Sequence, residues 1–226
     1  SQPAMGDLLD TWEKLLNAYD QVVYIPMSSG LSNSCSAAMA IAKEYEGRVS
    51  VVDNHRISVT LRQSVITAKA MAGEGKDAEE IKSFLEEEAF RSSIYVSVNT
   101  LEYLKKGGRI TPAAAMVGSV LSIKPVLTIQ GEKLDSFAKV RGNMKKCQLR
   151  MLEAMKTDIQ NRFSDVPEEQ LHIGTAGAGL NAECKNEWME MVREAFPKAD
   201  VYYNRLSASI AAHTGPGAVG LGASVF

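Results

Sequence analysis

Hydroxyl side chains gather in the stretch SSGLSNS, residues 28–34, which directly follows the apolar run VVYIPM. Such a run predicts a buried strand, and ligands of doubly wound sheets bind beyond the carboxyl ends of strands, where the next helix presents unpaired backbone N–H groups. We expect Ser32 to be the N-cap of that helix. Ser28, Ser29 and Ser34 would add hydroxyl donors. The pattern indicates a site for a carboxylate, a phosphate or another oxyanion. The alternative is that these serines only shape the turn and cap the helix.

Cations that lie next to glycines form a second candidate group. Arg109 follows the pair Gly107 and Gly108, and Arg141 precedes Gly142. Because a guanidinium is a planar fork of donors, it binds a carboxylate or a phosphate through two hydrogen bonds, so we rank both arginines above the neighbouring lysines. The alternative for each arginine is an ordinary solvated surface charge.

His213 is the histidine whose surroundings in the sequence could support chemistry. It begins the segment HTGPGA, which predicts a turn, and Thr214 follows it with a hydroxyl group. An imidazole in such a turn can face a cleft and donate or accept a proton near neutral pH. The alternative is a histidine whose ring nitrogens are satisfied by the backbone of the turn.

Composition and motifs argue against several classes of protein. The net charge of −2 and the pI near 6.0 give no positive footprint for nucleic acid or an anionic membrane, and the longest uncharged run is too short to span a bilayer. Three cysteines, far apart and without C-x-x-C spacing, argue against a disulfide framework or a zinc site. No nucleophile elbow surrounds Ser29, and no P-loop motif occurs. We expect a cytoplasmic protein without metal or cofactor.

The alternation of apolar runs with amphipathic stretches predicts an α/β fold. Strands at 22–26 and 48–53 are joined by a helix at 32–47, so a parallel pair is the economical arrangement. The composition changes near Ser92, where we place a boundary between domains 1–92 and 93–226. The other expected elements are helices at 6–19, 58–75, 77–92, 143–163 and 181–196, a small apolar helical segment at 112–123, a hairpin at 124–142 that turns at Gln130 and Gly131, and strands at 93–98, 171–177, 201–207 and 220–226.

Six motifs, in order and in context, carry a resemblance to a known family. They are SSGLSNS, VVDNHRISV, LEYLKKGGRI, the IKPVLTIQGEKL hairpin, KVRG and HTGPGA. Together they resemble the DegV-like bacterial fatty-acid-binding family over essentially the whole chain. The resemblance implies two α/β domains, the first with a parallel and the second with a mixed sheet, that enclose a long-chain fatty acid in an interdomain tunnel. It also implies a carrier rather than an enzyme, which presents the carboxylate to a separate fatty acid kinase for acyl-phosphate formation and phospholipid synthesis.

The family's functional residues can be carried over by position. Ser32 corresponds to the serine that binds the carboxylate. The other residues that the resemblance implies are Ser28, Ser29 and Gly30 in the loop, His213 and Thr214 near the headgroup, and Arg109 and Arg141 at or beside the mouth where the kinase and the acyl phosphate are engaged.

The chain departs from the family pattern at three places. Asn33 stands where a glycine usually follows the serine, and Asn54 replaces the usual serine after the aspartate. We expect the folded turn to survive both changes. The chain also begins with SQPAMGDLL, which resembles an internal motif of the family. We therefore expect a truncated or processed product that lacks an N-terminal strand and helix and the threonine preceding SQP, which would be one carboxylate ligand.

The apolar segment 112–123 could line the acyl tail, because its small residues leave room and methionine adapts in shape. Its tail candidates are Ala115, Met116, Val120 and Ile123, and the alternative is an ordinary core helix. A second function also stays open. A phosphate- or nucleotide-using enzyme would use residues 28–34 to cradle an oxyanion and His213 as a base.

Overall fold

The computed structural model describes residues 2–116 and 123–226, which divide into two compact units. The first unit comprises residues 1–57, 61–90 and 226, and the second comprises residues 58–60 and 91–225. The two units are defined by contacts between residues, which do not show whether either unit folds on its own. The domains 1–92 and 93–226 therefore remain a proposal about which parts of the chain fold independently.

The first unit contains the predicted parallel pair of strands. β1 (Val22–Tyr24) pairs with β2 (Val49–Val51), with Val22 opposite Val49. The connection runs through α2 (Ser34–Ala42) and a short 3-10 helix, Lys43–Tyr45. Gly47 follows the end of this helical segment and has a φ of 85°, in the left-handed region that costs glycine little.

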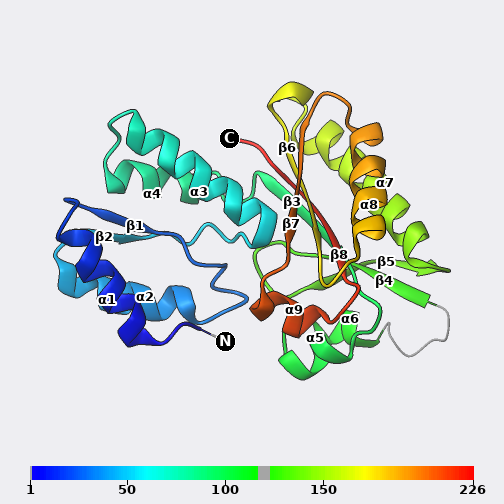
Figure 1. The fold of residues 1–226 in the computed structure, drawn as a ribbon, viewed down its shortest axis with the longest axis horizontal. Helices are drawn as coiled ribbons and strands as arrows, with labels where there is room; N and C mark the ends of the chain where they lie inside the picture. The colour runs from blue at the N-terminus through cyan, green and yellow to red at the C-terminus, as the bar shows by residue number, and fades with distance from the viewer. Residues whose placement is uncertain (1, 117–122) are drawn as a thin grey trace. The chain divides into compact units, whose positions relative to one another are not determined.

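Helices cover both faces of this small sheet (Figure 1). α1 (Met5–Leu16) and α2 pack on one face, and α3 (Ser58–Gly73) and α4 (Ala78–Glu87) lie on the other. The first core is built on Trp12, which is 1% exposed. The second is formed by Val52, Ala68, Ile81 and Leu85.

The second unit is built on a six-stranded sheet of order β5-β4-β3-β8-β6-β7. Only the pair β6 and β7 is parallel, so the sheet is mixed, as expected from the resemblance. The strands are β3 (Ser92–Ser97), β4 (Ile123–Thr128), β5 (Asp135–Arg141), β6 (His172–Gly177), β7 (Asp200–Arg205) and β8 (Val219–Ser224). β4 and β5 form the predicted hairpin.

The main core of the second unit lies between the sheet and two long helices, α7 (Met144–Arg162) and α8 (Ala182–Ala195) (Figure 1). Alternate residues of the central strands face these helices, because successive side chains of a strand point to opposite faces. Trp188 of α8 is fully buried there, and its indole N–H donates to the Gly220 carbonyl oxygen at 3.2 Å. Among the described residues, no helix combines the length and the apolar character that a membrane span requires.

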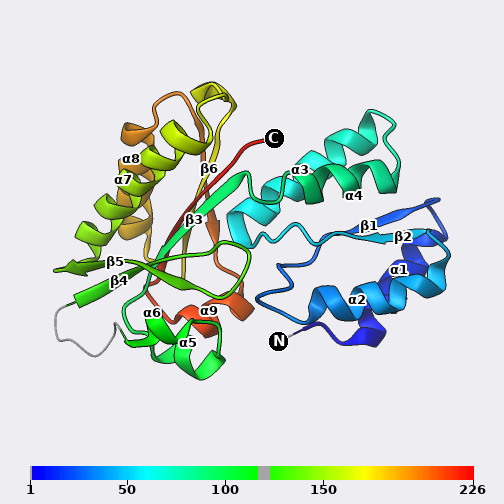
Figure 2. The ribbon, with the colours of Figure 1, turned by 180° about the vertical axis from the view of Figure 1, so that it is seen from behind.

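Three short helices gather at one end of the sheet (Figure 2): α5 (Glu102–Gly107), α6 (Pro112–Met116) and α9 (Ala208–Thr214). Two predictions fail here. α9 was not predicted, because a helix of seven residues is too short to show a periodic pattern and its last two residues, His213 and Thr214, were interpreted as the start of a turn. Ile123, which the sequence placed at the end of a helical segment 112–123, is instead the first residue of β4.

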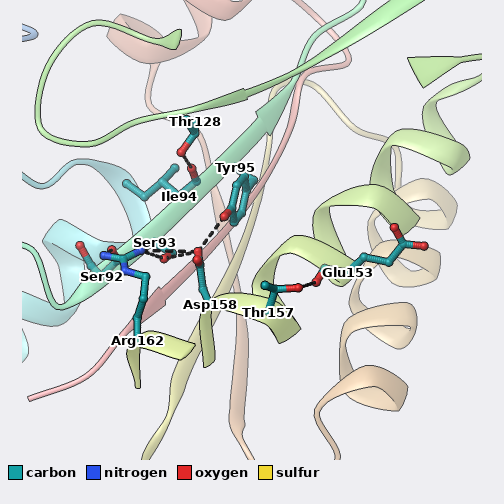
Figure 3. A network of polar contacts seen from close by, with 9 residues as sticks. All are labelled: Ser92, Ser93, Ile94, Tyr95, Thr128, Glu153, Thr157, Asp158 and Arg162. Carbon is teal, nitrogen blue, oxygen red and sulfur yellow. Dashed lines mark hydrogen bonds and ion pairs between the residues drawn. The ribbon is translucent and has the colours of Figure 1, made fainter. Parts of the chain in front are cut away.

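A polar cluster fastens α7 to β3 within the second unit (Figure 3). The Asp158 carboxylate accepts hydrogen bonds from the hydroxyls of Ser93, at 2.5 Å, and Tyr95, at 2.7 Å. Arg162 donates to the Ser93 hydroxyl at 2.6 Å and lies 3.5 Å from Asp158. Burial and the hydrogen bond to Asp158 raise the pKa of the Tyr95 phenol, so Tyr95 is a neutral donor at neutral pH.

Glycine is required where the first turn of α3 packs on the second unit's sheet. Gly174 and Gly222 are register partners, and a Cβ atom on Gly222 would lie 2.6 Å from Val59 Cγ2. We expect Gly222→Ala to lower the free energy of unfolding by about 1–3 kcal/mol through overpacking, measured by urea denaturation. Gly73→Ala is the control, because nothing lies within 4 Å of its Cβ position. The prediction fails if adding Val59→Ala does not restore part of the loss.

Candidate functional site

The serine loop, residues 28–34, is a tight turn that follows β1. The N–H groups of Leu31 and Ser32 both donate to the Ser28 carbonyl oxygen, at 3.0 and 3.1 Å. The Ser28 N–H donates to the Arg56 carbonyl oxygen at 2.9 Å. Ser28 is fully buried and Ser32 is 5% exposed, whereas Ser29 and Gly30 are half-buried. The predicted loop residues therefore do come together around one turn.

The prediction that Ser32 is the N-cap is wrong by one residue. α2 begins at Ser34, and Asn33 is its N-cap, without a capping hydrogen bond from its side chain. The turn around Ser28 keeps Ser32 outside the helix, which explains the shift. Ser32 Oγ still accepts the N–H of Ser34 at 3.2 Å, so it satisfies the first orphan donor of the helix. Asn33 has a φ of −71°, so its backbone does not require the glycine that the resemblance implies at this position.

The backbone of the loop differs from the expected cradle of unpaired N–H groups. The Ser29 N–H donates to Asp53 Oδ1 at 3.2 Å, and the Gly30 N–H donates to Ser28 Oγ at 3.2 Å. With the bonds above, the N–H groups of residues 28–32 and of Ser34 all have partners within the first unit. The loop also carries two adjacent hydroxyl groups, since Ser32 Oγ lies 2.8 Å from Ser34 Oγ.

Residues 53–56, which follow β2, hold the serine loop through hydrogen bonds. The sequence did not predict this role for them. Asp53 binds the Ser29 N–H, and the Arg56 carbonyl oxygen binds the Ser28 N–H. Asn54 is fully buried; its amide donates to Ser64 Oγ at 2.6 Å, so it is accommodated in place of the usual serine. The sequence did carry one signal for this contact. The serine loop follows β1 and this segment follows β2, and the carboxyl ends of two adjacent parallel strands meet at one edge of the sheet.

The Arg56 side chain anchors this segment inside the first unit. It is fully buried, and it donates to the carbonyl oxygens of Ala89, at 3.2 Å, and Glu88, at 2.5 Å. Its guanidinium carbon lies 4.3 Å from the centre of the Phe226 ring, a cation–π contact. Burial lowers the pKa of Arg56 to about 10, which leaves it a cation at neutral pH.

In the second unit, His213 and Arg109 lie beside the same glycine. A Cβ atom on Gly107 would be 2.3 Å from His213 Nδ1, so the ring packs directly on this backbone. Arg109 donates from Nη1 to the Gly107 carbonyl oxygen. Burial, and then the charge of Arg109, lowers the pKa of His213, which favours a neutral imidazole at neutral pH. Thr214 is buried, and its hydroxyl donates to the Ile210 carbonyl oxygen at 3.2 Å.

The other predicted residues of the second unit differ in their exposure to solvent. Arg141 is exposed at the end of the edge strand β5, and its register partner on β4 is Ile123. Ala115 is half-buried in α6, and Met116 is 74% exposed. Val120 lies outside the described residues. The roles of these residues as tail or kinase contacts stay predictions. Within the described part of the chain, no three acidic, His or Cys side chains gather as metal ligands do.

Comparison with known proteins places the chain in a family. A family model described as "Uncharacterised protein, DegV family" matches residues 1–225. A DegV domain-containing protein of Clostridium acetobutylicum is 30% identical over 230 residues, which span 98% of this chain and 76% of that protein.

Solved structures show the same fold. A DegV family protein from Thermus thermophilus, described by its fatty acid binding, has a TM-score of 0.86 and 31% identity, over 100% of this chain and 78% of that one. DegV from Bacillus subtilis, described as a fatty acid binding protein, has a TM-score of 0.81 and 28% identity, over 100% and 78% of the two chains. The chain belongs to the DegV family.

Proposed function

We propose that this chain binds a long-chain fatty acid and holds its carboxylate at the serine loop through Ser32, with Ser28, Ser29 and Gly30 shaping the loop. The observation that carries the proposal is the structural likeness to the Thermus thermophilus protein, a likeness that covers the whole of this chain. The description of that protein names fatty acid binding. The chemistry of the loop agrees with it. Buried hydroxyl groups suit a carboxylate, which offers only acceptors once it is ionised.

In this proposal, burial of the acyl tail supplies most of the binding free energy, and the hydrogen bond to the headgroup fixes the position of the ligand. Burial of a long chain at about 0.8 kcal/mol per CH2 gains on the order of 10 kcal/mol gross, whereas one hydrogen bond to a charged group contributes about 1.5–3 kcal/mol net. Ala115, Met116, Val120 and Ile123 remain the proposed tail contacts. His213 and Thr214 remain the proposed headgroup contacts of the second unit.

The bound acid is the substrate of another protein in this proposal. The chain is a cytoplasmic carrier that needs no cofactor, and a separate fatty acid kinase phosphorylates the carboxylate, so that the acyl phosphate enters phospholipid synthesis. Arg109 and Arg141 act on the docked kinase or on the acyl phosphate. The competing enzyme would need the loop N–H groups as an oxyanion cradle, and those of residues 28–32 are already bonded.

Extraction of the purified protein and mass spectrometry of the extract test the proposal. We expect one or a few long-chain fatty acids in a ratio approaching one per chain. A control extract from a protein of similar size, purified in the same way from the same cells, measures the lipid background. A nucleotide or a phosphorylated metabolite in place of the fatty acid would instead support the enzyme.

A further inference from the structure

We propose that Asn99 is a positioning residue, which fixes the turn after α9 and, through this turn, the His213 imidazole that meets the headgroup of the bound fatty acid. The inference rests on the proposed function and deepens it, since it names a residue that acts on headgroup recognition through another side chain. Asn99 lies between β3 and α5. The sequence did not predict a role for it.

Two segments of the second unit, residues 99–107 and 213–217, fit closely against each other where α5 packs on α9 (Figure 2). At three places a side chain of one segment lies against a glycine of the other, so closely that a Cβ atom on the glycine would be within 2.5 Å of it. The three contacts are Asn99 on Gly217, Tyr103 on Gly215, and His213 on Gly107. The position of the His213 ring therefore depends on how the two segments meet.

Asn99 makes two hydrogen bonds that tie the turn to the sheet. Its amide nitrogen donates to the Pro216 carbonyl oxygen at 3.2 Å, and its amide oxygen accepts from Lys124 Nζ at 3.0 Å. These partners fix the orientation of the amide, because a carbonyl oxygen only accepts and an ammonium group only donates. Asn99 thus joins the turn to β4, the strand on which Lys124 lies.

The turn begins where α9 ends. His213 lies in the last turn of α9, and Gly215 is the C-cap of this helix. Since α9 has only seven residues, it gains little stability by itself, and the position of its last turn depends on the segments packed against it. The Gly217 N–H also donates to the Ala178 carbonyl oxygen at 2.8 Å, so loss of the Asn99 side chain is expected to loosen the turn without detaching it.

The charge state of His213 explains why its position matters. Burial, and then the charge of Arg109, lowers the pKa of His213, so the imidazole is neutral at neutral pH. A neutral ring meets a carboxylate through one directional N–H bond, which weakens steeply when its angle departs from linearity. When the turn is loosened, the ring takes more positions, and fewer of them suit this bond.

The test is a double-mutant cycle with two ligands of equal tails, hexadecanoic acid and hexadecanol. Affinities for the delipidated protein are measured by displacement of a fluorescent fatty acid. Asn99→Ala is expected to lower the ratio of acid to alcohol affinity about fivefold, and His213→Ala about tenfold, the loss of about one hydrogen bond to a charged group. In the His213→Ala background, Asn99→Ala is expected to change the ratio by less than about twofold, because the contact through which Asn99 acts is gone.

Two further variants test the geometry of the amide. Asn99→Asp keeps an acceptor for Lys124 but cannot donate to the Pro216 carbonyl oxygen, so its ratio is expected to fall at least as far as that of Asn99→Ala. Asn186→Asp makes the same change of charge at an exposed asparagine of α8 and is expected to behave as the wild type. For Asn99→Ala, the affinity for hexadecanol is expected to stay within about twofold, because the tail contacts do not change.

The possible results separate the inference from the proposed function. An unchanged ratio in Asn99→Ala, or equal losses in the wild-type and His213→Ala backgrounds, would overturn the inference while leaving fatty acid binding intact. An unchanged ratio in His213→Ala would overturn it as well, because the headgroup is then recognised without this ring. A wild-type protein that binds neither ligand would overturn the proposed function, and the inference with it.

Discussion

Arg141→Ala is expected to retain its co-purified fatty acid while losing most kinase-dependent acyl-phosphate formation, by about tenfold or more. The physical reason is the position of the side chain. Arg141 is exposed at the end of an edge strand, so it can meet a docked kinase or the charge that develops on the acyl phosphate. Fatty acid content is measured by extraction, and acyl-phosphate formation is measured with ATP and a fatty acid kinase.

Lys139→Ala is the matched control, because it removes one positive charge from the same strand, two residues away, at a side chain that is also exposed. It is expected to retain most of the activity. Added salt should reproduce part of the Arg141→Ala defect in the wild-type protein through screening. Loss of fatty acid from a folded Arg141→Ala protein would place the residue in the binding site. Full activity of that variant would make it a solvated surface charge.

Asp158→Ala is expected to lower the free energy of unfolding by about 2–4 kcal/mol. The substitution removes the acceptor of two hydroxyl groups, on Ser93 and Tyr95, and the ion-pair partner of Arg162 (Figure 3). The cost is large because the Tyr95 hydroxyl, in a residue only 4% exposed, is left without a strong acceptor where α7 packs on β3. Urea denaturation followed by circular dichroism measures the change.

Glu153→Ala provides the comparison on the same helix. Its carboxylate is 70% exposed and pairs with Arg150 at 3.4 Å, so its loss is expected to cost less than about 0.5 kcal/mol. Asp158→Asn should lie between the two, because an amide oxygen still accepts one of the hydroxyl groups. Equal stabilities of Asp158→Ala and Glu153→Ala would show that the cluster does not fasten the helix to the sheet.

The elements that carry local patterns were predictable from the sequence. Val22 and Val49 lie in short apolar runs separated by a helical stretch, and they are register partners in the parallel pair. The hairpin of β4 and β5 was visible from two strand-like runs around Gln130 and Gly131, and Gly131 has a φ of 84°. Handedness rules and period-two alternation are sufficient for such elements.

The rest depended on contacts between residues far apart in the sequence. The partner of the Ser29 N–H is Asp53, and the cluster at Asp158 joins residues of β3 and α7. Neither set of contacts can be predicted from the spacing of the residues along the sequence. The helix α9 was missed because its seven residues are too few for a periodic pattern. The assignment of Ser32 as the N-cap failed for a related reason, since the turn at Ser28 delays the helix to Ser34.

A crystal structure of the protein with bound hexadecanoic acid tests the central claim most directly. We predict that one carboxylate oxygen lies within about 3 Å of Ser32 Oγ, at hydrogen-bond distance, and that Ser34 Oγ stays within hydrogen-bond distance of Ser32 Oγ. A fatty acid whose carboxylate is bound elsewhere, with the serine loop empty or occupied by a phosphate group, would contradict the account.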